Sequence, residues 1–166
     1  MKNKNIISPS VKIINPKNLI LGKNIRIDDG VILICKKKMI IESNVHIGPY
    51  SVLRSHEKLQ IGKYSLISSF VDIFTSDENV NDMNKLSHPM IKKKNFKDKR
   101  APIKIGNYSF VGSHSVILPG SNLSEGTSVG ALTLINFKTE RWTIYNGNPA
   151  RSFGQRNKNL FKKNLK

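Results

Sequence analysis

Aliphatic residues recur every six positions along much of this chain. Between residues 105 and 135 they fall at Ile105, Val111, Ile117, Leu123, Val129 and Ile135. An α-helix of 3.6 residues per turn does not give this spacing, and neither does a single strand of period two. A spacing of six results when two or three strand residues and a corner form a unit that repeats.

The same spacing extends towards the N-terminus in groups of three. Groups begin at Leu21, Ile41 and Ile61, twenty residues apart, whereas the groups that begin at Ile105 and Leu123 are eighteen apart. Four positions after such an anchor the residue is often small or β-branched. The position directly after an anchor is often glycine, as at Gly22, Gly48, Gly62, Gly106, Gly112 and Gly130. The full set of seventeen anchors is completed by Ile7, Ile13, Ile27, Leu33, Ile47, Leu53, Ile67, Ile73, Val111, Ile117, Val129 and Ile135.

This pattern predicts an all-β fold, a parallel β-solenoid in which three short strands make one triangular coil. The anchors point inward and stack on the anchors of the next coil, about 4.8 Å away. Glycine is expected at tight corners, where φ is positive.

Two segments depart from the repeat. Between Ile73 and Ile105 lie 32 residues where continuous coils need 18 or 20, so we expect a loop insertion at about 77–102, with a functional role. Residues 150–166 space Phe153 and Phe161 roughly helically, which predicts a short basic C-terminal helix or tail after a β-helix over 1–149.

The formal net charge of +17 raises the question of nucleic acid. Lysine outnumbers arginine 22 to 6, although arginine is the better reader of bases, so no nucleic-acid partner is expected. A basic surface also suits small anions, such as a phosphorylated cofactor or a nucleotide-linked sugar. The single cysteine, Cys35, cannot form an internal disulfide, which predicts a cytoplasmic protein. The lack of a long apolar run predicts no integral membrane segment. Cys35 is rejected as a nucleophile because no motif surrounds it.

The tandem hexads, together with VGSHSVILPG (111–120) and YNGNPAR (145–151), resemble the hexapeptide-repeat acyltransferases, close to the maltose/galactoside and polysaccharide O-acetyltransferases. The resemblance implies a left-handed β-helix, a homotrimer with active sites between subunits, and acetyl-CoA as co-substrate without a metal. It further implies a sugar acceptor from polysaccharide or nucleotide-sugar biosynthesis, with its hydroxyl or amine left open.

Acetyl transfer needs a base for the acceptor proton, and histidine is the natural base near neutral pH. His88 lies in the long loop, where the family carries its catalytic histidine, and His56 lies at a corner that resembles the serine acetyltransferase site; both remain candidates. Ser76 stands where close relatives have histidine, twenty residues after His56, so the two share a corner in successive coils. Ser76, Asp77 and Glu78 are the candidate acceptor contacts, and Asp77 and Glu78 could also orient an imidazole. His46 and His114 are interpreted as solvated corner residues.

The hexad positions and the resemblance also suggest contacts to the donor. The candidates for coenzyme A binding are Gly112, Ser113, Gly130, Ala131, Lys138, Asn148, Pro149 and Arg151. Trp142 is interpreted as a packing residue. Because Ser76 replaces the usual histidine, a catalytically impaired β-helix scaffold is the alternative function. A γ-type carbonic anhydrase is discounted because the spacing of its metal-binding histidines is absent.

Overall fold

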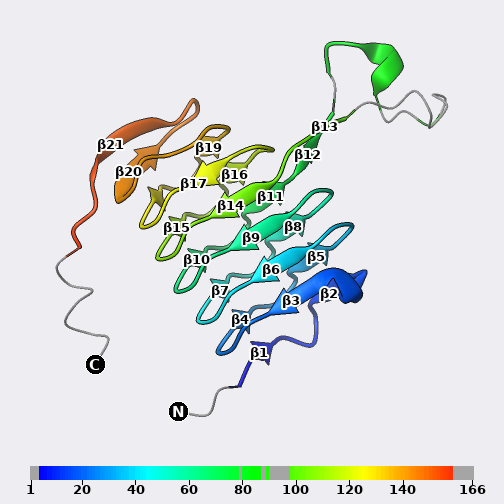
Figure 1. Ribbon diagram of the computed structural model, residues 1–166, viewed down its shortest axis with the longest axis horizontal. Helices are drawn as coiled ribbons and strands as arrows, with labels where there is room; N and C mark the ends of the chain where they lie inside the picture. Colours follow the sequence, from blue (N-terminus) through cyan, green and yellow to red (C-terminus); the bar gives the residue numbers. More distant parts are fainter. Residues whose placement is uncertain (1–3, 79, 87–88, 90–97, 159–166) are drawn as a thin grey trace.

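The protein is an all-β, left-handed parallel β-helix whose three sheets enclose a triangular prism. Figure 1 shows its coils stacked one on the next. The computed structural model describes residues 4–78, 80–86, 89 and 98–158. Each coil contributes one strand to each of three sheets, here called A, B and C. Every pairing within these sheets is parallel except the last one in sheet A, so the predicted solenoid is confirmed.

The three sheets contain nearly all of the regular structure. Sheet A contains β1 (Ile6–Ile7), β4 (Arg26–Ile27), β7 (His46–Ile47), β10 (Leu66–Ile67), β15 (Phe110–Val111), β18 (Ser128–Val129), β20 (Thr143–Asn146) and β21 (Arg151–Gln155). Sheet B contains β2 (Lys12–Ile14), β5 (Ile32–Ile34), β8 (Val52–Arg54), β11 (Asp72–Phe74), β16 (Val116–Ile117) and β19 (Leu134–Ile135). Sheet C contains β3 (Leu19–Leu21), β6 (Met39–Ile41), β9 (Leu59–Ile61), β14 (Ile103–Ile105) and β17 (Asn122–Leu123).

The anchors form the core of the prism by stacking on one another. Ile47 pairs with Ile67, and Ile67 pairs with Val111, although 44 residues separate the latter two. All anchors are buried except Ile7, Ile13 and Leu21, which belong to the first coil and have no coil beneath them. The aliphatic column therefore forms the interior, as predicted.

Small polar residues fill the second inward column and bond to the neighbouring coil. Ser65 Oγ donates to the carbonyl of Gly106 over 3.0 Å, and Ser115 Oγ donates to that of Gly130 over 2.8 Å. Among the described residues no buried side-chain polar atom lacks a partner. These hydroxyls therefore sit in a dry interior without the cost of an unsatisfied group.

The glycine column has a different cause from the predicted one. None of the six glycines after the anchors has a positive φ. A Cβ on Gly112 would lie 2.6 Å from the backbone nitrogen of Ala131 in the next coil, so close coil stacking requires glycine there. The left-handed corner positions instead carry residues such as Tyr50, Phe70 and His114, whose rings stack.

The insertion leaves the prism through a short antiparallel ribbon. In this ribbon β12 (Ser76–Asp77) pairs with β13 (Lys99–Arg100), so it begins one residue before the expected start of the insertion at 77 and ends two residues before its expected end at 102. Two single 3-10 turns, η1 (Pro16–Asn18) and η2 (Met83–Lys85), are the helices that the described residues form, and both are far shorter than a membrane span. In Figure 1, η2 lies beyond the ribbon, away from the coils.

The C-terminal segment begins as a strand rather than as the predicted helix. Arg151–Gln155 folds back as β21 and pairs antiparallel with β20, the outermost parallel strand of sheet A. An unpaired sheet edge exposes backbone groups, and this pairing covers them. The predicted helical residues from 159 onwards lie outside the described residues.

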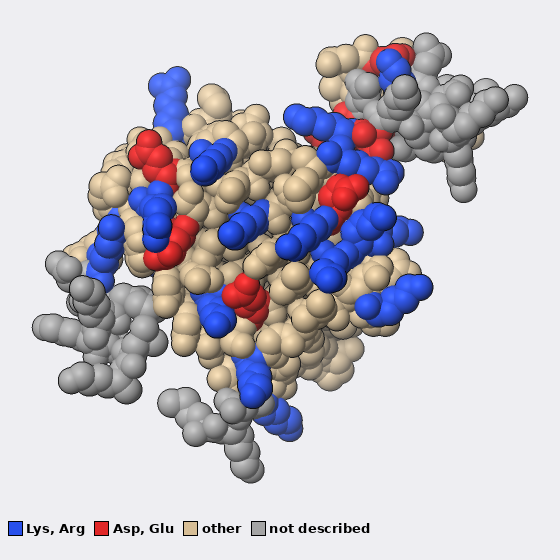
Figure 2. Space-filling view, in the orientation of Figure 1, with Lys and Arg blue, Asp and Glu red and all other residues tan. Residues whose placement is uncertain are grey.

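Basic side chains are spread over the face formed by sheet C and are densest below the β12–β13 ribbon (Figure 2). Acidic side chains lie among them. The charge of +17 therefore does not form one continuous stripe on this face.

Candidate functional site

The corner between sheets B and C brings His56 and Ser76 together. His56 follows β8, and Ser76 follows β11 in the next coil at the base of the insertion. Nδ1 of His56 lies 2.6 Å from Oγ of Ser76. The twenty-residue spacing had predicted this stacking.

A hollow of about 360 Å³ opens at this corner, and we call it the His56 hollow. Three residues proposed from the sequence as acceptor contacts, Ser76, Asp77 and Glu78, line it together with His56. The complete lining is Arg54, His56, Phe74, Ser76, Asp77, Glu78, Asp98 and Arg100. The structure therefore assembles the predicted acceptor residues around one histidine.

Four members of the lining were missed by the sequence analysis. Arg54 and Phe74 are outward-facing neighbours on β8 and β11, and the Cζ atom of Arg54 lies 4.7 Å from the centre of the Phe74 ring. Arg100 reaches the hollow because β13 pairs it with Ser76 across the insertion, and its Nε donates to both carboxylate oxygens of Asp98 at 2.9 and 2.8 Å. The register between coils places Arg54 beside Phe74, so the repeat could have identified these two residues. Asp98 and Arg100 reach the hollow through the antiparallel β12–β13 pairing, which the repeat does not contain.

The surroundings of His56 lower the pKa of its imidazole below the ordinary 6.5. Burial is the largest cause, and the nearby charges of Arg100, Lys36 and Arg54 act in the same direction, while Asp98 opposes them. This lowered pKa favours the neutral form of the imidazole at pH 7. A neutral imidazole keeps one nitrogen lone pair, which can accept a proton.

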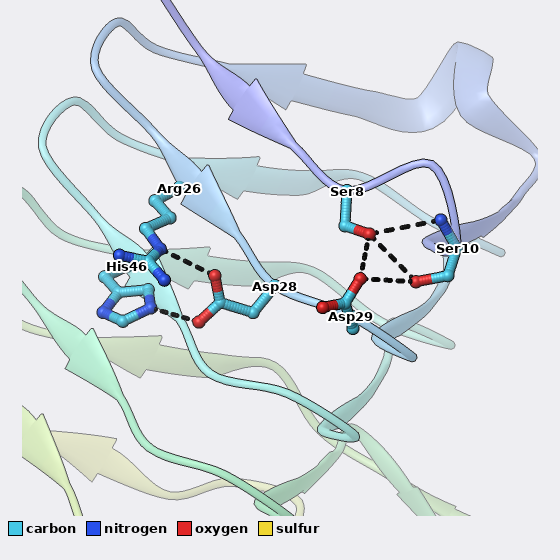
Figure 3. Close-up of polar contacts among 6 residues, drawn as sticks. All are labelled: Ser8, Ser10, Arg26, Asp28, Asp29 and His46. Atoms are coloured by element: carbon cyan, nitrogen blue, oxygen red, sulfur yellow. Dashed lines mark hydrogen bonds and ion pairs between the residues drawn. The ribbon is translucent and has the colours of Figure 1, made fainter.

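The remaining histidines differ from His56. His46 lies on sheet A, where its Nε2 is 2.7 Å from a carboxylate oxygen of Asp28, and Arg26 binds the other oxygen of Asp28 (Figure 3). His114 stacks on Phe70 with ring centres 4.8 Å apart. His88, the other predicted base, lies outside the described residues.

Candidate donor contacts lie at the corner between sheets A and B. The amides of Gly112 and Gly130 already donate to Val129 and Tyr145 of the next coil, both over 2.8 Å. The adjacent amides of Ser113 and Ala131 make no hydrogen bond within the part of the chain that the structure describes. Ser113 and Ala131 are therefore the better candidates for backbone contacts to an extended amide arm.

The other predicted donor residues occupy two places. Asn148 and Pro149 form the turn between β20 and β21, and Arg151 begins β21 with its side chain exposed. Lys138 lies on the sheet C side, bridged to Asn122, so the structure does not group it with the corner between sheets A and B. Among the described residues, no cluster of three or more His, Cys, Asp or Glu side chains forms a metal site.

Comparison with known proteins identifies acyltransferases that are similar to this chain in sequence or in structure. No protein-family model matches the chain. It is 32% identical over 144 residues to the dTDP-4-amino-4,6-dideoxy-D-glucose acyltransferase of Escherichia coli. The matched region covers 86% of this chain and 74% of the relative.

Two solved structures are similar. The first is AntD, an N-acyltransferase from Bacillus cereus in complex with dTDP and 3-hydroxybutyryl-CoA, at a TM-score of 0.89 and 29% identity over 98% of this chain and 85% of AntD. The second is a hexapeptide-repeat acetyltransferase of Vibrio cholerae complexed with acetyl-CoA, at a TM-score of 0.61 and 17% identity over 93% of this chain and 69% of that chain. The second likeness concerns the fold alone.

Proposed function

Because the chain belongs to the hexapeptide-repeat acyltransferases, we propose that it transfers an acyl group from an acyl-coenzyme A to the amino group of a dTDP-linked 4-amino-4,6-dideoxy sugar. The observation that carries the proposal is the His56 hollow, in which a neutral imidazole held by Ser76 faces the predicted acceptor residues. The Escherichia coli relative acts on such a sugar, and an AntD variant has been solved in complex with dTDP-4-amino-4,6-dideoxyglucose and coenzyme A.

His56 acts as the general base in this proposal. With the Nδ1 hydrogen donated to Ser76 Oγ, Nε2 keeps a lone pair. The acceptor nitrogen attacks the thioester carbonyl, Nε2 takes the proton that the nitrogen loses, the C–N bond forms and the C–S bond breaks. The proton then passes to the departing sulfur, which leaves coenzyme A as a thiol.

Asp77 and Glu78 have the charge that an amino acceptor requires. An amino sugar arrives partly as an ammonium ion, and two carboxylates on the rim of the hollow favour its approach. The amine, once deprotonated, is the stronger nucleophile. These side chains therefore favour an amine over a hydroxyl as the acceptor.

The donor residues support a reaction between copies of the chain. Ser113 and Ala131 lie at the edge of sheet B that adjoins sheet A, whereas His56 lies at the edge that adjoins sheet C. Within one chain the width of sheet B separates them. In a homotrimer, the corner between sheets A and B of one chain could lie beside the His56 hollow of the next chain. The donor contacts and the proposed base would then meet in one site. The further candidates for contacts to the coenzyme A phosphates are Asn148, Pro149, Arg151 and Lys138.

The direct test is turnover by the purified protein in the presence of dTDP-4-amino-4,6-dideoxyglucose. Acetyl-CoA is the expected donor and 3-hydroxybutyryl-CoA the comparison, with thiol release as the readout and mass spectrometry of the product. Calorimetry with coenzyme A addresses the alternative of an inactive scaffold, which binds none. We place the reaction in the cytoplasm, in nucleotide-sugar metabolism that supplies polysaccharides.

A further inference from the structure

Two arginines of the His56 hollow have no part in the proton transfer. The guanidinium of Arg54 lies over the Phe74 ring, which holds this plane in place, and this guanidinium makes no hydrogen bond to another described residue. Arg100 is oriented through Nε by Asp98, so its terminal nitrogens have no partner within the described part of the chain. Both guanidinium groups are thus oriented, and their terminal N–H donors have no hydrogen-bond partner among the described residues, although Asp98 forms an ion pair with Arg100 through Nε.

Planar guanidinium groups with free N–H donors bind phosphate oxygens through paired, charge-assisted hydrogen bonds. Resting on the proposed function, we propose that Arg54 and Arg100 bind the diphosphate of the nucleotide-linked acceptor. They thereby select a nucleotide-linked sugar over the free amino sugar. Asp77 and Glu78 on the same hollow complement the amino group, so the lining matches a molecule with a cationic and an anionic end.

Coenzyme A also contains a diphosphate, so the geometry must assign the source. In a nucleotide-linked 4-amino sugar, one pyranose ring separates the reacting amine from the diphosphate. In an acyl-coenzyme A, the whole pantetheine arm separates the thioester from the diphosphate. Because Arg54, Arg100 and His56 line one hollow, a diphosphate bound there belongs to the acceptor.

The test is calorimetric binding of dTDP and, separately, of coenzyme A to the full-length protein. Arg54→Gln and Arg100→Gln each remove a guanidinium, and Lys36→Gln is the matched control, since Lys36 is a nearby cation that does not line the hollow. We expect each arginine variant to weaken dTDP binding about tenfold or more, with coenzyme A binding unchanged. Lys36→Gln should bind dTDP within about twofold of the wild type.

Arg100→Lys guards against a loss of local structure, because it keeps the charge near Asp98 but removes the planar fork. We expect it to weaken dTDP binding by less than Arg100→Gln does. Turnover of the wild type together with undiminished dTDP binding by both glutamine variants overturns this inference and leaves the proposed function standing. Weakened coenzyme A binding with unchanged dTDP binding overturns the assignment to the acceptor. A wild type that binds no dTDP and transfers no acyl group overturns the proposed function as well.

Discussion

Ser76 Oγ lies 2.6 Å from Nδ1 of His56, and this contact joins two successive coils at the mouth of the insertion. The bond fixes the plane of the imidazole and determines which of its nitrogens is directed elsewhere. The corner that orients this ring also carries the loop, so the scaffold and the proposed chemistry meet at one place.

Replacing His56 tests the base directly. We expect His56→Ala to lower kcat by about 10²- to 10⁴-fold, because the amine then loses its proton acceptor. Thermal unfolding should remain near that of the wild type, since His56 is only partly buried. Full activity of His56→Ala with collapse of His88→Ala would move the base to the loop, and full activity of both variants would contradict any histidine base.

Removing the partner of the ring should have a smaller effect than removing the ring itself. We expect Ser76→Ala to lower kcat about tenfold, because an imidazole without this hydrogen bond loses its fixed orientation. The Km for acyl-CoA should not change. Steady-state kinetics at saturating donor measures both quantities, and a change confined to Km would contradict an orienting role.

The titration of His56 has a definite sign. Because burial and neighbouring cations lower its pKa, the NMR midpoint of its imidazole should fall below 6.5. Arg100→Gln removes a cation beside the ring, so it should raise that midpoint towards 6.5. His56→Ala identifies the resonance, and a wild-type midpoint above 6.5 would refute the expected electrostatics.

The core predicts a contrast between two isoleucines. Ile117 is fully buried on β16, whereas Ile20 on β3 is 47% exposed. We expect Ile117→Ala to lower the free energy of unfolding by about 2–5 kcal/mol and Ile20→Ala to change it by less than about 1 kcal/mol. Urea denaturation compares them, and equal losses would contradict the inward stacking of the anchors.

Asp28 links pH to stability through its contacts with His46 and Arg26. Burial raises the pKa of Asp28, but the hydrogen bonds from His46 and Arg26 outweigh it and leave this pKa below 3.8. The carboxylate therefore stabilises the fold above pH 3.8, and this contribution is lost as the pH falls through the folded-state pKa. We expect Asp28→Asn to be less stable than wild type near neutral pH, with a difference that shrinks in urea titrations below that pKa.

The fold could be predicted because one inward residue per hexad determines it. Val111 stacks on Ile67 across the insertion as it would across an ordinary coil, since only neighbouring coils interact. The six-residue period did not predict that Ile7 would be exposed, because the period does not mark where the first coil begins and no coil lies beneath Ile7. The C-terminal strand was missed because its cause, the open edge of β20, is a property of the assembled sheet.

The site could be predicted only where it follows the repeat. His56 and Ser76 share a corner by spacing, and Asp77 and Glu78 follow in sequence. Arg54 has the pattern of an ordinary solvated strand residue, and Arg100 reaches the hollow through an antiparallel pairing that no hexad contains. The placement of His88 and the roles of the donor residues stay predictions.

The ribbon at the base of the insertion gives the molecule a replaceable part. The amide of Ala101 donates to the carbonyl of Thr75 over 3.1 Å, so the chain departs from the prism and rejoins it at adjacent points. The segment between β12 and β13 can change in length and composition while Ile67 and Val111 keep their pairing and Ser76 and Arg100 stay at its base. New acceptor preferences can therefore evolve, or be grafted, by exchanging this one segment on an unaltered stack.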